Sequence, residues 1–76
     1  MNGATPEEIA TMRHMLGADS PSPGFRNYGA WDDDDPHLNA MVDKGLVRKA
    51  NMIPGGLRYY VVNDEWCKGL GITVSR

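Results

Sequence analysis

The sequence has a single cysteine, Cys67, among its 76 residues, so no disulfide can form within the chain. It contains no apolar run near the roughly 20 residues that span a bilayer, and no basic-then-apolar leader. These absences exclude the disulfide-stapled class of small secreted domain and predict a cytoplasmic protein without a membrane partner. The chain is also too short to form two hydrophobic cores. We therefore expect one domain over residues 1–76.

The usual short motifs of enzymes and metal sites are missing as well. No CxxC or HExxH is present, and Gly55-Gly56 is followed by neither the lysine nor the helix of a phosphate-binding loop. Cys67, His14 and His37 are the only thiol and imidazoles, and their spacing alone does not define a nucleophilic pair. We expect Cys67 to be a buried structural thiol. The sequence predicts no enzyme activity and no cofactor, and it assigns no role to either histidine.

Charge is divided unevenly along the chain. Residues 1–38 hold seven acidic and two basic side chains, whereas residues 39–76 hold three acidic and six basic ones, for a net charge of −2. Such a division can steer or dock a charged partner, and it can equally arise by chance because a small domain has few surface charges. The isoelectric point near 5.5 lies far from the basic range of an autonomous nucleic-acid binder.

Two helices have clear start and stop signals. Thr5 to Glu8 form a capping box with a proline at the first helical position, which predicts a helix over 6–16. Asp35 as the N-cap residue and the following proline begin a second helix over 36–44, which Gly45 ends. Between them, Phe25, Tyr28 and Trp31 recur every third residue, a spacing that predicts one or two helical turns with the three rings near one face.

The last third of the chain has the composition of strands. Leu57–Val62 is rich in aromatic and β-branched residues, and Pro54-Gly55-Gly56 forms a turn before it, so we predict an antiparallel hairpin over 46–62. Asn63 begins a short closing turn through Trp66. The fold class is therefore α+β, with helices packed on a β-hairpin. The predicted core consists of Ile9, Met12, Leu16, Tyr28, Leu38, Met41, Val42, Leu46, Val47, Tyr60, Val62 and Trp66.

Two resemblances extend this interpretation. The helix over 36–44, followed by Gly45-Leu46-Val47 and the strand Arg58–Asn63, resembles the second half of winged-helix domains, which implies a small winged-helix-like domain. Arg13–Gly17 and Phe25–Tyr28, together with those later segments, look like short proteins encoded by phages and prophages. This second resemblance implies a viral protein acting in the host cytoplasm. The group includes inhibitors of host defence systems, anti-CRISPR proteins among them, as well as regulators.

The run Asp32-Asp33-Asp34-Asp35 is the most unusual feature of the sequence, and three hypotheses apply to it. It can be a solvated helix end in which one aspartate is the cap and the others favour the helix dipole. It can be a docking patch for an Arg- or Lys-rich surface. It can be a calcium or magnesium site with His37 as a further ligand, although Pro36 occupies the position where the next EF-hand ligand belongs. We expect no metal.

Two functions remain open. In the first, the chain is a non-enzymatic interaction module, an inhibitor of a host defence complex, which docks on the basic surface of a host protein or ribonucleoprotein. Its predicted binding patch is acidic and aromatic: Trp31, Asp32, Asp33, Asp34, Asp35 and Tyr59. In the second, the chain is a DNA-binding transcriptional regulator that uses a basic wing: Arg48, Lys49 and Arg58. The aspartates would lie beside phosphates if the second helix entered the major groove, which favours the first. The partner's identity and the oligomeric state stay open.

Overall fold

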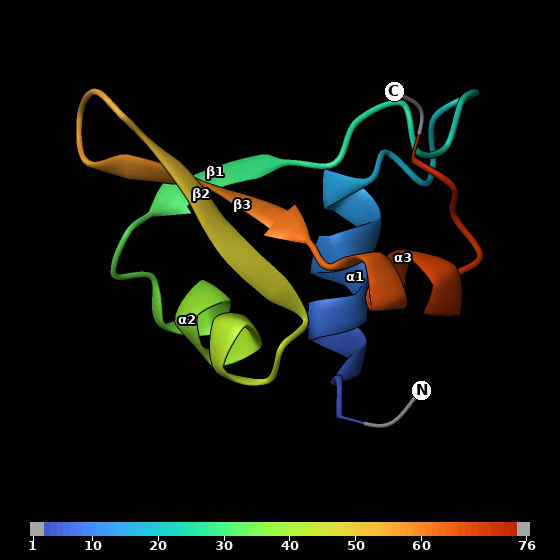
Figure 1. Cartoon of the computed structure of the whole chain (residues 1–76), viewed down its shortest axis with the longest axis horizontal. Helices are drawn as coiled ribbons and strands as arrows, with labels where there is room; N and C mark the ends of the chain where they lie inside the picture. The colour runs from blue at the N-terminus through green and yellow to red at the C-terminus, as the bar shows by residue number, and fades with distance from the viewer. Residues whose placement is uncertain (1–2, 75–76) are drawn as a thin grey trace.

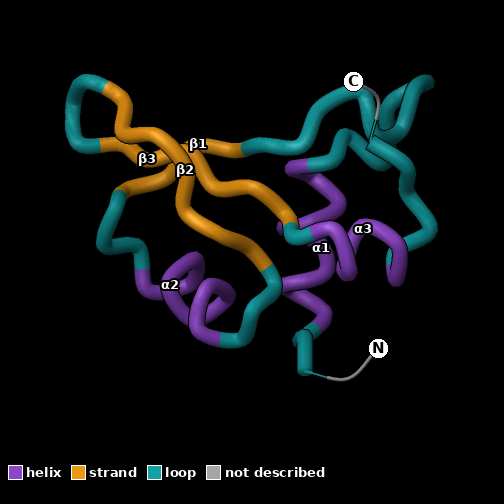
Figure 2. Tube along the Cα trace, viewed as in Figure 1, coloured by secondary structure: helices purple, strands orange, loops and turns teal. Residues whose placement is uncertain are grey.

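A computed structural model describes residues 3–74, which form three helices and three strands (Figure 1). The helices are α1 (Pro6–Met15), α2 (Pro36–Asp43) and α3 (Asp64–Gly69), and the strands are β1 (Gly29–Asp32), β2 (Val47–Ile53) and β3 (Leu57–Val62). The strands form one sheet in the order β1-β3-β2 with both pairings antiparallel. The tip of the β2–β3 hairpin extends beyond the helices (Figure 2). The predicted α+β class and hairpin are confirmed.

The predicted helix signals operate as expected. The amide of Thr5 donates to Glu8 Oε1 at 2.9 Å and the amide of Glu8 donates to Thr5 Oγ1 at 3.2 Å, which completes the capping box. In α2, Asp35 Oδ1 accepts from the amide of Leu38 at 3.0 Å. Gly45, at a φ of 77°, then turns the chain so that the amide of Leu46 donates back into the last turn of α2.

The prediction of helical turns over residues 25–31 is wrong. These residues form a loop and then β1, which pairs with β3 from Gly29 opposite Tyr60 to Asp32 opposite Leu57. The side-chain amide of Asn27 continues this pairing, because its Nδ2 donates to the Val62 carbonyl and its Oδ1 accepts from the Val62 amide, each at 2.9 Å. The backbone thereby gains sheet hydrogen bonds that one or two isolated helical turns would not supply.

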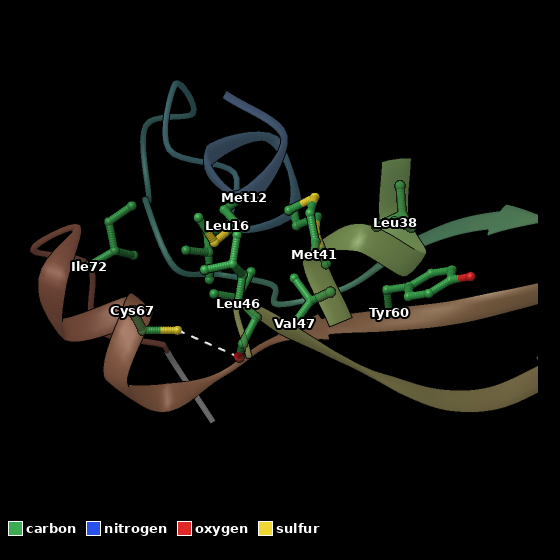
Figure 3. Packing of buried hydrophobic residues seen from close by; sticks show 11 residues of the cluster. Met12, Leu16, Leu38, Met41, Leu46, Val47, Tyr60, Cys67 and Ile72 are labelled. Carbon is green, nitrogen blue, oxygen red and sulfur yellow. Dashed lines mark hydrogen bonds between the residues drawn. The ribbon is translucent and has the colours of Figure 1, made fainter. Parts of the chain in front are cut away.

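The placement of Tyr28 in the core is also wrong, since the residue is 54% exposed. The rest of the predicted core is largely confirmed, with Ile9, Val42 and Trp66 only partly buried at its edge. The prediction omitted Met15 and Ile72, and Cys67 is buried as expected. Figure 3 shows the buried side chains gathered between the helices and one side of the sheet. The closing turn predicted after Asn63 is the helix α3, which extends to Gly69.

A buried carboxylate joins the two longer helices. Glu8 is only 4% exposed, and besides closing the capping box of α1 its Oε1 accepts from Lys44 Nζ at 2.8 Å. Lys44 is the C-cap residue of α2, so the ion pair fixes the start of α1 against the end of α2. The Lys44 ammonium and the Thr5 amide hold the pKa of Glu8 below its ordinary value.

This ion pair predicts a pH-dependent contribution to stability. Because the pKa of Glu8 is lower in the folded state than its ordinary value of 4.5, its contribution is fully present well above that pH and is lost as the pH falls through the lowered pKa of the folded state. Glu8→Gln keeps a capping-box residue but removes the charge, so we expect a loss on the order of 1 kcal/mol at pH 7 and a weaker acid dependence. Urea unfolding between pH 3 and 7 measures both. The matched control is Glu7→Gln at an exposed neighbouring position, and equal pH profiles for the two variants would contradict the assignment.

Candidate interaction surface

The four consecutive aspartates, residues 32–35, form the turn between β1 and α2, which we call the acidic turn. Its backbone closes through a hydrogen bond from the Asp35 amide to the Asp32 carbonyl at 3.1 Å. Asp35 is the N-cap residue of α2, as predicted. Asn39, one turn into α2, donates from Nδ2 to the carbonyls of Asp33 at 3.2 Å and Asp35 at 3.0 Å. The turn is therefore held by α2 and is not a loose charged loop.

Asp33 faces the hairpin and carries the turn's ion pairs. Its Oδ1 accepts from Arg58 Nε and from Lys49 Nζ, the latter at 3.4 Å, and Lys49 also donates to the Asp33 carbonyl at 3.1 Å. The hydrogen bond from Arg58 is the main reason that the pKa of Asp33 lies below its ordinary value. Tyr60 contacts the acidic turn from the core, where its hydroxyl donates to the Asp32 carbonyl at 2.9 Å. Asp33 thus joins the acidic turn to β2 and β3.

Asp32 and Asp34 have a different environment. Both are exposed, and neither forms an ion pair within residues 3–74. Of the four aspartates in the predicted binding patch, Asp35 caps a helix and Asp33 pairs with Lys49 and Arg58. The carboxylates of the remaining two, Asp32 and Asp34, face solvent. The first hypothesis for the run, a solvated helix end, accounts for Asp35 as the cap and for the exposure of Asp32 and Asp34, but it does not account for the ion pairs of Asp33 with Lys49 and Arg58.

The structure does not bring the two predicted aromatic contacts together. Trp31 lies opposite Arg58, on the inner face of the sheet, where its ring packs edge-on against Tyr60 with 6.2 Å between ring centroids. Tyr59 lies opposite Ala30 on the outer face and is 37% exposed. Tyr60, by contrast, is buried, as its place in the predicted core requires. Trp31 supports the turn from the inner face.

Tyr28 takes the place beside Tyr59 that sequence reasoning gave to Trp31. The two tyrosine rings meet edge-on, with centroids 5.6 Å apart and an interplanar angle of 82°. Together with Ala50 and Val61 they line a shallow depression of 330 Å³. Interpreting residues 28–32 as a strand would have found this residue, because positions 28, 30 and 32 then share one face.

The three basic residues of the alternative hypothesis are all engaged inside the domain. Lys49 and Arg58 bind Asp33, and Arg58 Nη1 also donates to the Ala50 carbonyl at 2.8 Å. Arg48 Nη1 donates to Asn63 Oδ1 at 3.0 Å at an exposed position and has no carboxylate partner in the described part of the chain. Arg48 is thus the member of this set with the most unused hydrogen-bonding capacity.

Cys67 and the two histidines lie in different surroundings. Burial raises the pKa of the Cys67 thiol, whose Sγ donates to the Val62 carbonyl at 3.8 Å. His37 Nε2 is 3.0 Å from Thr11 Oγ1 and so joins α2 to α1. His14 lies near the C-terminal end of α1, where its carbonyl accepts from Arg26 Nη2 at 2.8 Å, a contact that suits the negative end of a helix dipole. Across residues 3–74, no three His, Cys, Asp or Glu side chains gather as metal ligands.

The fold and surface define a small α+β domain with a fixed acidic turn and exposed tyrosines. No family model, curated protein or solved structure matches the chain. None of the helices within residues 3–74 is long and apolar enough to cross a membrane.

Because the aspartates of the acidic turn have different roles, substituting them should lower the unfolding free energy by different amounts. Asp35→Ala should cost about 1 kcal/mol of unfolding free energy because it removes an N-cap, whereas Asp35→Asn should cost much less because asparagine also caps. Asp32→Asn and Asp34→Asn should each change stability by less than about 0.5 kcal/mol, as expected for exposed side chains. Chemical unfolding of the four variants checks this order. Equal costs at all four would mean that the structure assigns the roles wrongly.

Proposed function

We propose that this chain is a non-enzymatic protein-binding module that docks through its acidic turn on a basic surface of a partner. The observation that carries this proposal is the pair of exposed, unpaired carboxylates on a turn that α2 and the hairpin hold in place. Tyr59 lies on the same face as Asp32, two positions along the sheet, and adds an aromatic contact of the kind that often dominates interfaces. Asp33, Asp35 and Trp31 act as supports for this surface.

The partner class comes from the resemblance to phage-type proteins. We propose a host protein or ribonucleoprotein complex, with inhibition of a defence system as the outcome of binding. A surface that normally holds nucleic acid presents Lys and Arg side chains, and carboxylates in place of phosphates suit it. Long-range attraction between the unpaired carboxylates and such a surface would mainly raise the association rate.

A winged-helix DNA binder is the second candidate. The order α2, β2, β3, with β1 as a third strand, favours it, since a helix followed by an antiparallel hairpin is the second half of that fold. Two observations weigh against it. Within residues 3–74 the element before α2 is a strand, where a helix-turn-helix has a helix. Lys49 and Arg58 also bind Asp33, which leaves Arg48 as the main contact for a phosphate backbone.

The test compares charge removal at two places on the surface. A tagged chain is used to isolate its partner from a bacterial lysate, and the purified pair is then studied by stopped-flow or biosensor kinetics. We expect Asp32→Asn with Asp34→Asn to lower the association rate by about tenfold at low salt and to flatten its salt dependence. The control is Asp64→Asn with Glu65→Gln, which removes the same charge from exposed positions on α3.

Two results would reject the proposal. The first is an association rate and salt dependence that stay the same in the acidic-turn variant. The second is firm retention of the wild-type chain on immobilised DNA at moderate salt, abolished by Arg48→Glu, which would favour the winged-helix candidate. Far-UV circular dichroism of each variant verifies that the fold is intact.

A further inference from the structure

The sheet has an outer face that the two longer helices do not cover. In β3, Tyr60 and Val62 point into the core, so Leu57, Tyr59 and Val61 point to the opposite side. Pairing adds Ala30 from β1, opposite Tyr59, and Ile53 from β2, opposite Leu57. Tyr28 and Ala50 join them through the depression that they line with Tyr59 and Val61. These seven residues form what we call the outer face.

The outer face is apolar and faces solvent. The buried side chains of α1 and α2 pack on the other side of the sheet, between the helices and the strands (Figure 3). Tyr28 is 54% exposed and Tyr59 is 37% exposed, although both rings are large enough to stabilise a core. A contiguous apolar patch of this kind on a small domain marks an interaction site.

Two opposite charges lie at diagonally opposite corners of this face. Arg48 is opposite Val61 on β2, and Asp32 is opposite Leu57 on β1. Four residues along β3 and two strand spacings separate them, which is about 13 Å along the strands and about 10 Å across. Neither forms an ion pair within the described part of the chain. A two-fold rotation about an axis that lies in the interface, perpendicular to the line between these two corners, lays one outer face on another and exchanges the corners.

We infer that the outer face binds a second copy of this chain in a two-fold symmetric dimer. The tyrosines and aliphatic side chains form the centre, and Arg48 of each copy meets Asp32 of the other at the two ends. A surface with one cation and one anion at opposite corners is complementary to itself, which is what an isologous interface requires. A uniformly basic partner suits this whole face less well, because Arg48 lies beside the depression and would repel it.

The size of the face sets the strength of the dimer. Three strands about 4.8 Å apart, with segments of five to seven residues, give a face about 15 Å wide and about 20 Å long. Two such faces cover about 600 Å² in total, which lies below the roughly 1,200 Å² at which the range of standard specific complexes begins. The dimer should therefore be weak and reversible, and it should be populated only at high protein concentration. Since Asp32 and Tyr59 belong to both surfaces, a second copy and a basic partner would exclude each other there.

Sedimentation equilibrium of the full chain, from about 5 to about 500 µM, tests the inference without any partner. We expect the mean mass of the wild type to rise from 8.4 kDa toward twice that value as the concentration increases. Arg48→Glu alone and Asp32→Arg alone should each weaken association by at least tenfold, since each variant brings like charges together at both ends of its dimer. Lys68→Glu on α3 and Asp34→Arg beside the face are controls that should leave association unchanged.

The decisive experiment mixes the two weakened variants in equal amounts. In a dimer of one Arg48→Glu chain and one Asp32→Arg chain, both end contacts again join opposite charges, so the mixture should associate about as well as the wild type. A mixture that stays monomeric overturns the two-fold pairing, and a wild type that stays monomeric throughout overturns the dimer. Amide NMR of the wild type is a check without mutation: shifts that depend on concentration should map to the outer face, and shifts confined elsewhere would contradict it.

Discussion

The ion pairs of Asp33 with Arg58 and Lys49 determine how the charges of this protein can be used. They tie the acidic turn to the hairpin and place α2 at a fixed distance from β2 and β3. They also remove one aspartate and two bases from the charges available to a partner. The run of four acidic residues and the set of three basic ones look like two competing sites in the sequence, but in the fold one aspartate and two of the bases meet in a partly exposed contact. What faces solvent is smaller and more specific: Asp32 and Asp34 on the turn, and Arg48 at the opposite corner of the sheet.

The sheet separates structural from surface aromatic residues. Trp31 and Tyr60 meet on the inner face and support the turn, whereas Tyr28 and Tyr59 meet on the outer face. A shift of β1 by one residue would turn Trp31 to the outer face and Tyr28 to the inner face, because neighbouring strand residues point to opposite sides. The side-chain amide of Asn27, bonded to both backbone groups of Val62, opposes such a shift. Asn27 thus helps to keep Tyr28 on the outer face, where a partner can reach it, and Trp31 on the inner face.

Sequence reasoning located the features that local chemistry determines. Thr5, Glu8 and Asp35 cap their helices, Gly45 ends α2, and the aromatic and β-branched run of β3 is a strand, because each of these signals acts within a few residues. It missed β1, since a four-residue edge strand containing Gly29 forms only when β3 is there to pair with it. It also missed the contacts of Glu8 with Lys44 and of Asp33 with Arg58, which join residues 36 and 25 positions apart. These contacts depend on how the helices and strands are arranged in space, and the spacing of the residues along the sequence does not reveal them.

The pKa of the Asp33 carboxyl, followed by carbon-detected NMR during an acid titration, most directly tests whether the acidic turn is tied to the hairpin. If it is, the pKa of Asp33 lies below its ordinary value in the wild type and rises toward that value in Arg58→Gln, because the main hydrogen bond to the carboxylate is then lost. A pKa of Asp33 that is the same in the wild type and in Arg58→Gln would contradict this arrangement of charges. Asp33 would then be a free surface charge, and the hairpin would again present its cations to solvent.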